Sequence, residues 1–128
     1  MSTGKEPQIS LEQIYAVIKQ PVPVGHRVLT DRLWPRGLKK TQLEEKKITW
    51  YRGASPSTEL RKAFHAKDLN VDEFNQAYQK QLKSDPDQLK PLVELAEQGP
   101  LTLLTAMRNP ADTYLSVLAE LIRAQLKA

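Results

Sequence analysis

Three short apolar stretches of the chain have the pattern expected of β-strands. They lie around residues 14–18, along residues 27–33, and in the LTLLTA segment at residues 101–106. Each is bounded by polar, proline or glycine residues, as strands buried in a sheet are. Because the proline- and glycine-containing connection at residues 21–25 is short, the first two strands are predicted to pair antiparallel.

Apolar residues three and four positions apart predict four helices in the rest of the chain. Residues that cap helices mark their starts, namely Ser55 or Ser57, Asn70 with Glu73, Asp85 or Asp87, and Asn109 followed by Pro110. Residues 37–54 show no sustained period and are predicted to be irregular, with a short helical turn around residues 38–46. The order of the elements predicts the α/β class, with a small mixed sheet of about three strands and helices packed on it, Rossmann-like. The strands at residues 27–33 and 101–106 are predicted to be parallel and adjacent, because the helices between them make a crossover possible.

Length and composition favour one globular domain. With 128 residues, of which 40% are hydrophobic and 27% charged, the chain is long enough for one core and short for two. We expect a single α/β domain over residues 9–128 and a flexible tail over residues 1–8. No apolar run approaches the roughly 20 residues of a membrane span. Without a secretory pattern at its start and without cysteine, the chain is predicted to be cytoplasmic and free of disulfides and thiolate chemistry.

Basic residues concentrate between Arg36 and Lys62. This segment holds eight Lys or Arg residues and three Glu residues, a local charge of +5, so the rest of the chain carries −1 of the net +4. A basic segment suits an anionic partner, either a phosphorylated small molecule or a nucleic-acid backbone. A solvated surface that only maintains solubility explains the same pattern, and the sequence leaves both interpretations open.

Two predicted strands lead directly into loops that carry charged residues, DRLWPRG at residues 31–37 and MRNP at residues 107–110. If the strands are parallel and adjacent, both loops emerge at the edge where open α/β sheets bind their ligands. Guanidinium groups and a helix N-terminus both complement phosphate or carboxylate oxygens, and an indole can stack on a base or sugar. The predicted ligand-binding residues are Arg32, Trp34, Arg36, Ser57, Arg61 and Arg108, with Asp31 as the candidate acid, base or orienting group.

Several of these residues also have a purely structural interpretation. Asp31 and Arg32 can neutralise each other at a strand end, because ionised groups near a core are usually paired. Trp34 and Trp50 can be core anchors rather than ligand walls. Arg108 is harder to explain structurally, because a cation just before a helix start opposes the helix dipole and gains little without an anion.

The segments RVLTDRLWPRG, PSTELRKAF and LTLLTA, together with Trp50, Phe74 and Tyr78, resemble the YeaO-like family within the broader domain of unknown function 488. The resemblance spans about residues 14–126 and implies a small bacterial α/β domain to which no activity is assigned. The residues that match the shared motifs are Asp31, Arg32, Trp34, Pro35, Arg36, Gly37, Pro56, Ser57, Leu60 and Arg61.

The chain departs from the family pattern in two places. Val71 stands where members usually carry a tryptophan, and Thr113-Tyr114-Leu115 stand where they usually carry Asn-His-Ala. If that histidine serves chemistry in the relatives, this chain has lost it, and a binding role gains weight.

Three functions remain open from the sequence. In the preferred one, the protein acts on or senses a phosphorylated small molecule such as a nucleotide, held by Arg36, Arg61 and Arg108. The second is a nucleic-acid-binding module that uses the basic segment, with weak, salt-dependent and non-specific binding. The third is a protein-interaction domain in which the DRLWPRG motif is architectural. The sequence has no familiar nucleotide-binding, deaminase or metal-ligand motif, so neither a cofactor nor a metal is predicted, and it leaves catalysis and oligomeric state undecided.

Overall fold

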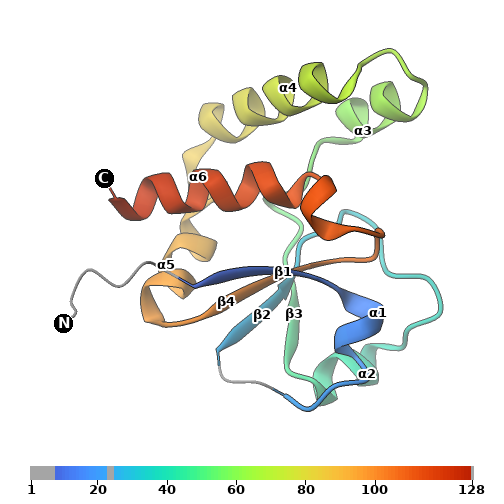
Figure 1. The fold of residues 1–128 in the computed structure, drawn as a ribbon, viewed down its shortest axis with the longest axis vertical. Helices are drawn as coiled ribbons and strands as arrows, with labels where there is room; N and C mark the ends of the chain where they lie inside the picture. The colour runs from blue at the N-terminus through green and yellow to red at the C-terminus, as the bar shows by residue number, and fades with distance from the viewer. Residues whose placement is uncertain (1–7, 23–24, 128) are drawn as a thin grey trace.

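A parallel β-sheet lies at the centre of the protein (Figure 1). The computed structural model describes residues 8–22 and 25–127. The strands found there are β1 (Ile9–Gln13), β2 (His26–Leu29), β3 (Ile48–Trp50) and β4 (Leu101–Thr105). Within the described residues they form one four-stranded sheet in the order β1-β4-β2-β3, and every neighbouring pair is parallel.

Helices cover both faces of this sheet. In the described residues they are α1 (Ile14–Val17), α2 (Lys40–Glu45), α3 (Thr58–His65), α4 (Val71–Ser84), α5 (Lys90–Gln98) and α6 (Leu115–Lys127), with the 3₁₀ turns η1 (Pro86–Gln88) and η2 (Pro110–Asp112). The short helices α1 and α2 lie on one face, whereas α4, α5 and α6 lie on the other, with α3 beside α4 (Figure 1). The three layers bury both faces of the sheet, as a parallel sheet requires.

The two central strands divide their side chains between two cores. Val28 and Leu103 pack in the core under α4, α5 and α6, whereas their neighbours Leu29 and Leu104 pack against α1 and α2. None of the four is more than 1% exposed. Since successive side chains of a strand point to opposite faces, burial on both faces explains why these segments are apolar without interruption.

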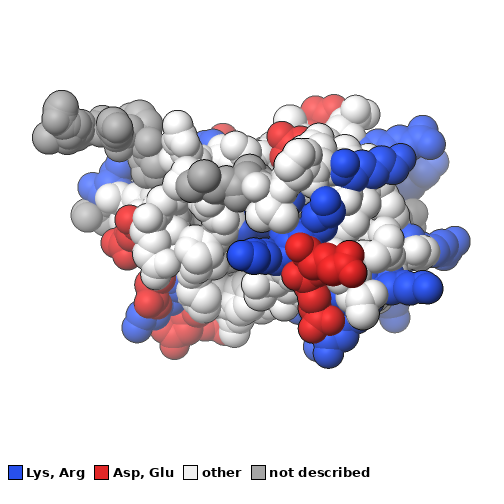
Figure 2. All heavy atoms as spheres, turned by 90° about the horizontal axis from the view of Figure 1, so that it is seen from below, with Lys and Arg blue, Asp and Glu red and all other residues white. Residues whose placement is uncertain are grey.

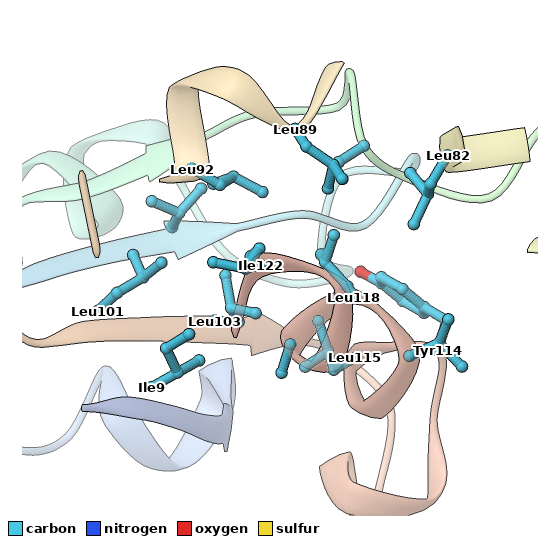
Figure 3. Close-up of a cluster of buried hydrophobic side chains, with 14 of the residues drawn as sticks. Ile9, Leu82, Leu89, Leu92, Leu101, Leu103, Tyr114, Leu115, Leu118 and Ile122 are labelled. Carbon is cyan, nitrogen blue, oxygen red and sulfur yellow. The ribbon is translucent and has the colours of Figure 1, made fainter. Parts of the chain in front are cut away.

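The larger core joins β4 to the helices above it (Figure 3). Leu101 and Leu103 of β4 cluster with Leu118 and Ile122 of α6 and with Leu92 of α5. Burying one such side chain contributes about 1.5–3 kcal/mol relative to leaving it in water. The spacing of Leu118 and Ile122, one helical turn apart, places both on the face of α6 that meets the sheet.

The predicted fold class is confirmed, and so is its central feature. β2 and β4 are parallel neighbours, with Arg27 opposite Thr102 and Leu29 opposite Leu104. The sheet differs in detail from the prediction, because it is wholly parallel rather than mixed and has four strands in the described residues rather than about three. The additional strand, β3, lies inside the segment that was predicted to be irregular, just after the predicted short helical turn, which is α2.

The predicted antiparallel pair near the N-terminus is wrong. The apolar run at residues 14–18 is mostly the helix α1, and the strand β1 precedes it. Ile14 and Val17, which are three positions apart, are the buried residues of that run, and this spacing is helical. β1 and β2 both pair with β4, which lies between them, so the connection between β1 and β2 is a crossover rather than a hairpin.

Helix starts agree with the prediction at two positions and differ at two others. Ser57 caps α3, and Asn70 forms a capping box with Glu73 at the start of α4. Asp85 or Asp87 was predicted to cap a helix, but Asp85 precedes only the 3₁₀ turn η1, and α5 begins at Lys90 without a side-chain cap. The last helix was predicted to begin at Pro110, but only a 3₁₀ turn forms there and α6 begins at Leu115. Asn109 adopts the left-handed conformation, with φ of 51°, and its side chain makes no capping bond, so it does not start an α-helix.

Two predictions fall partly outside the described residues. Of the predicted tail at residues 1–8, only Gln8 is described, and its carbonyl accepts a hydrogen bond from the Leu101 N–H (2.9 Å). Residues 23 and 24 of the predicted connection also lie outside. Across residues 8–22 and 25–127, no helix has the length and apolar character needed to span a membrane.

Candidate functional site

The loops that follow β2, β3 and β4 meet at the carboxyl edge of the sheet. The Asp31 carboxylate, just after β2, accepts a hydrogen bond from the backbone N–H of Ala106, just after β4 (Oδ2 to N, 2.8 Å). The backbone carbonyl of Asp31 accepts another from the indole Nε1 of Trp50 in β3 (2.7 Å). Asp31 therefore ties three strand ends together at the edge where open α/β sheets usually bind ligands.

The second oxygen of Asp31 is bound by Tyr114, which precedes α6. The Tyr114 hydroxyl donates to Asp31 Oδ1 (2.5 Å) and lies 2.9 Å from Thr30 Oγ1. Burial, with the added effect of the Asp31 charge, raises the pKa of Tyr114 well above its ordinary value. The hydroxyl therefore stays protonated and acts as the hydrogen-bond donor to Asp31. Both carboxylate oxygens of Asp31 thus have a donor within the protein.

Arg32 makes its own contact rather than neutralising Asp31. Its Nε donates to the backbone carbonyl of Pro56 (3.0 Å). This bond holds the guanidinium group but leaves its two terminal nitrogens out of the contact. Asp31 and Arg32 therefore each have partners of their own, and an ion pair between them is not required to explain either residue.

Arg32 lines an open groove of about 690 Å³ beside the loop after β3. We call it the arginine groove, and its lining includes Arg32, Arg52, Gly53, Gln81, Asp85 and Gln88. Two cationic side chains therefore border one depression, with a single acidic residue, Asp85, among the residues named. The groove is lined from both sides, by the loops after β2 and β3 and by the end of α4 with the turn η1.

Hydrogen bonds fix the amide side chains of the arginine groove. Gln81 Oε1 accepts from the Ser57 N–H (2.8 Å), and Gln81 Nε2 donates to the Ser55 carbonyl (2.9 Å). Gln88 Nε2 donates to the Asp85 carboxylate (3.2 Å). Because Gln81 uses both ends of its amide to hold the chain ahead of α3, its position in the lining depends on that segment.

Gly53 allows close packing at one wall of the arginine groove. A Cβ atom at this position would lie 2.3 Å from Gln88 Oε1 and 2.5 Å from the Tyr51 hydroxyl oxygen. Tyr51 donates to the Gln88 carbonyl (2.7 Å), so these neighbours are themselves tied together. A side chain at position 53 would have to displace them, which explains the glycine without any demand on its backbone angles.

A second depression has a volume of about 580 Å³. We call it the tryptophan hollow, and it is lined by Trp34, Lys40, Leu43, Glu44, Ile48 and Trp50. Trp34 and Trp50 are half-buried and meet edge to face, with ring centroids 5.1 Å apart. The Arg52 guanidinium lies 4.5 Å from the centroid of the Trp50 ring, so Arg52 contacts one depression and lines the other.

The remaining predicted site residues lie elsewhere. Arg36 and Arg108 are exposed, and neither is among the residues that line the two depressions. Ser57 uses its hydroxyl to accept the Leu60 N–H at the start of α3 (3.1 Å). Arg61 is half-buried, and its Nε is buried without a hydrogen-bond partner among the described residues. Of the predicted set, Arg32 lines the arginine groove and Trp34 lines the tryptophan hollow.

Sequence reasoning missed Arg52, Gln81, Gln88 and Tyr114. Arg52 follows β3 by two residues, so recognising that strand would have placed it at the same edge as Asp31. Gln81 and Gln88 carry no motif and could not be singled out. Tyr114 could be noticed only as a departure from the family pattern.

The surface charges do not form one basic track on the face that Figure 2 shows. Lys and Arg side chains lie there in separate groups, and Asp and Glu side chains lie directly against the central group. In the part of the chain that the structure describes, no group of three or more His, Asp or Glu side chains is placed to hold a metal ion.

Comparison with known proteins identifies the family. A family model described as the inactive DUF488-N3 subclade (DUF488-N3i) matches residues 8–128. The uncharacterized protein YeaO of Escherichia coli is 41% identical over 100 residues, which are 78% of this chain and 85% of YeaO. The uncharacterized proteins Mb3100c of Mycobacterium bovis and Rv3073c of Mycobacterium tuberculosis are each 36% identical over 101 residues, 79% of this chain and 83% of theirs. No solved structure gives a significant match. The chain therefore belongs to the YeaO-like DUF488 family, within the subclade that is described as inactive.

Proposed function

We propose that this protein binds a small anionic ligand, such as a phosphorylated small molecule, in the arginine groove, and that it senses or carries this ligand rather than transforming it. The observation that supports the proposal is the presence of Arg32 and Arg52 in the lining of one open groove. Guanidinium groups are the side chains best suited to phosphate and carboxylate, since they offer parallel N–H donors and stay charged.

The geometry around Arg32 favours an anion over a purely structural role. The bond from Arg32 Nε to the Pro56 carbonyl orients the guanidinium group, which lowers the entropy that binding would otherwise lose. Gln81, held by two backbone groups, adds a fixed amide to the lining. The Asp85 carboxylate would repel a ligand's anionic group, so the groove should favour ligands whose negative charge lies beside Arg32 and Arg52, away from Asp85.

Two observations favour binding over catalysis. Asp31, the candidate acid or base, has both carboxylate oxygens engaged by Ala106 and Tyr114. Tyr114 also lies in the Thr113-Tyr114-Leu115 segment, where members of the wider family usually carry Asn-His-Ala. The description of the matching subclade as inactive agrees with this choice.

The proposal is tested by calorimetric titration of the full chain with inorganic phosphate, pyrophosphate and a panel of sugar phosphates and nucleotides. Arg32→Ala with Arg52→Ala should weaken binding by at least about a hundredfold, since each charge-assisted hydrogen bond contributes about 1.5–3 kcal/mol. The matched control is Arg36→Ala with Arg108→Ala, which removes the same charge from exposed positions outside the groove and should change affinity little. If the control pair abolishes binding instead, the anion is held by Arg36 and Arg108, and the arginine groove is not its site.

Nucleic-acid binding is the alternative, and salt separates it from a pocket. A module that contacts six or more phosphates loses roughly 10³-fold or more in affinity between 50 and 200 mM salt. A groove with two arginines should lose far less. On the face that Figure 2 shows, the separation of the basic groups favours the small ligand.

A further inference from the structure

The tryptophan hollow and the arginine groove have opposite chemistry and are joined by one contact. One is lined by two indoles with Leu43 and Ile48, the other by two arginines with polar side chains. The Arg52 guanidinium over the Trp50 ring is the contact between them. A ligand that extends from the arginine groove across Arg52 into the tryptophan hollow would therefore contact cationic groups at one end and aromatic rings at the other.

Both indoles are fixed before any ligand arrives. Trp34 Nε1 donates to the Leu38 carbonyl (2.7 Å), and Trp50 Nε1 donates to the Asp31 carbonyl (2.7 Å). Their polar atoms are satisfied by the protein itself, so what the rings offer a ligand is apolar surface. The hollow also falls within the roughly 300–1,000 Å³ typical of small-molecule sites.

We infer that the ligand of the arginine groove also carries a planar aromatic ring, as a mononucleotide does, and that this ring sits in the tryptophan hollow. The inference rests on the proposed function, because the phosphate is the part that the arginine groove would hold. Aromatic rings associate favourably edge to face and offset, so the Trp34–Trp50 pair can accept a third ring. Lys40 and Glu44 in the lining supply a donor and an acceptor for the polar edge of a base.

The competing account is that Trp34 and Trp50 only close the smaller core. Both rings do pack against that core, beside Leu43 and Ile48. On this account the hollow has no ligand, and a phosphate compound binds equally well with or without a ring. The two accounts therefore differ in an affinity ratio that can be measured on the unmodified protein.

The experiment compares adenosine 5′-monophosphate with ribose 5-phosphate by calorimetry on the full chain. Stacking of a base on aromatic side chains should make the nucleotide bind at least about tenfold more tightly. Trp34→Leu should remove this advantage while leaving the affinity for ribose 5-phosphate unchanged, and Trp34→Phe should keep most of it. Leu33→Ala, at the exposed neighbouring position outside both linings, is the control that should change neither affinity.

The possible outcomes distinguish failure of this inference from failure of the proposed anion-binding function. Equal affinities of the two compounds, both lost in Arg32→Ala with Arg52→Ala, would overturn the aromatic part and leave the anion site standing. Failure of both compounds and of the other anions to bind would overturn both proposals. Since the ratio is measured first on the unmodified protein, poor folding of Trp34→Leu leaves the test intact.

Discussion

Two buried tyrosines should make the stability of the protein sensitive to alkaline pH. Tyr78 is fully buried and donates to the Ala54 carbonyl (2.5 Å), while Tyr114 is 7% exposed and donates to Asp31. Burial first, and then the charge of Asp31, raises the pKa of both hydroxyls well above the ordinary 10.0. Both groups must therefore stay protonated for the native packing around Asp31 to persist.

The direction of the effect follows from which state ionises first. Above pH 10.0 these tyrosines lose their protons in the unfolded chain but keep them in the folded protein, so rising pH favours unfolding. Their contribution to stability is complete below that pH and is lost as the pH approaches the raised folded-state values. Between pH 10.0 and the raised folded-state values, each pH unit should remove roughly 1 kcal/mol per tyrosine. For the two tyrosines together, this loss is a substantial share of the roughly 5–15 kcal/mol by which domains are stable.

Tyr114→Phe isolates half of this effect. The variant has one fewer titrating hydroxyl, so its loss of stability between pH 9 and pH 11 should be about half that of the unmodified protein. At neutral pH it should be less stable than the unmodified protein by about 1–3 kcal/mol, because Asp31 Oδ1 loses its donor. Urea unfolding followed by circular dichroism, at neutral pH and in steps above pH 9, measures both quantities, with Tyr78→Phe as the parallel variant. Alkaline profiles of equal steepness for Tyr114→Phe and the unmodified protein would refute the buried, protonated state of Tyr114.

Two further changes test local geometry. Gly25→Ala should destabilise the protein by more than about 2 kcal/mol, since its Cβ would lie 2.5 Å from the Pro100 carbonyl oxygen at a φ of +105°. Gly37→Ala, with φ of +84° and no atom within 4 Å, measures the backbone strain alone, and equal losses in urea unfolding would contradict the steric argument. Asn70→Ala should remove about 1 kcal/mol from the free energy of unfolding, because the Glu73 N–H loses its acceptor, Asn70 Oδ1 (2.8 Å). An unchanged melting temperature would show that this cap contributes nothing in solution.

The centre of the sheet could be predicted because its strands are specified locally. LTLLTA is apolar on both faces and bounded by Gly99 and Pro100 on one side, which permits little besides a buried strand. Such strands sit in the middle of parallel sheets, covered by helices on both sides. The long helical segment before it then makes a parallel partner at β2 the natural arrangement.

The two strands that the sequence pattern did not reveal, β1 and β3, are the edges of the sheet. β1 alternates between buried or half-buried and exposed residues, with Ser10 and Glu12 exposed, so it lacks an apolar run. β3 has three residues, of which Thr49 is exposed. An edge strand has one neighbour and less buried surface, so its sequence is less constrained and its pattern weaker.

The same weakness at the edge explains why the site was only partly predictable. The DRLWPRG motif suggested a ligand-binding site because it carries charged residues directly after a strand. Several of its residues are nevertheless explained by contacts within the fold. Asp31 accepts from Ala106 and Tyr114, and the Arg36 carbonyl accepts from the Tyr15 hydroxyl (2.7 Å). Among the charged side chains of the motif, Arg32 is the one that lines the arginine groove in the described part of the chain. Its partner there follows β3, the strand without a detectable pattern, so no spacing rule applied to the motif alone could pair the two arginines.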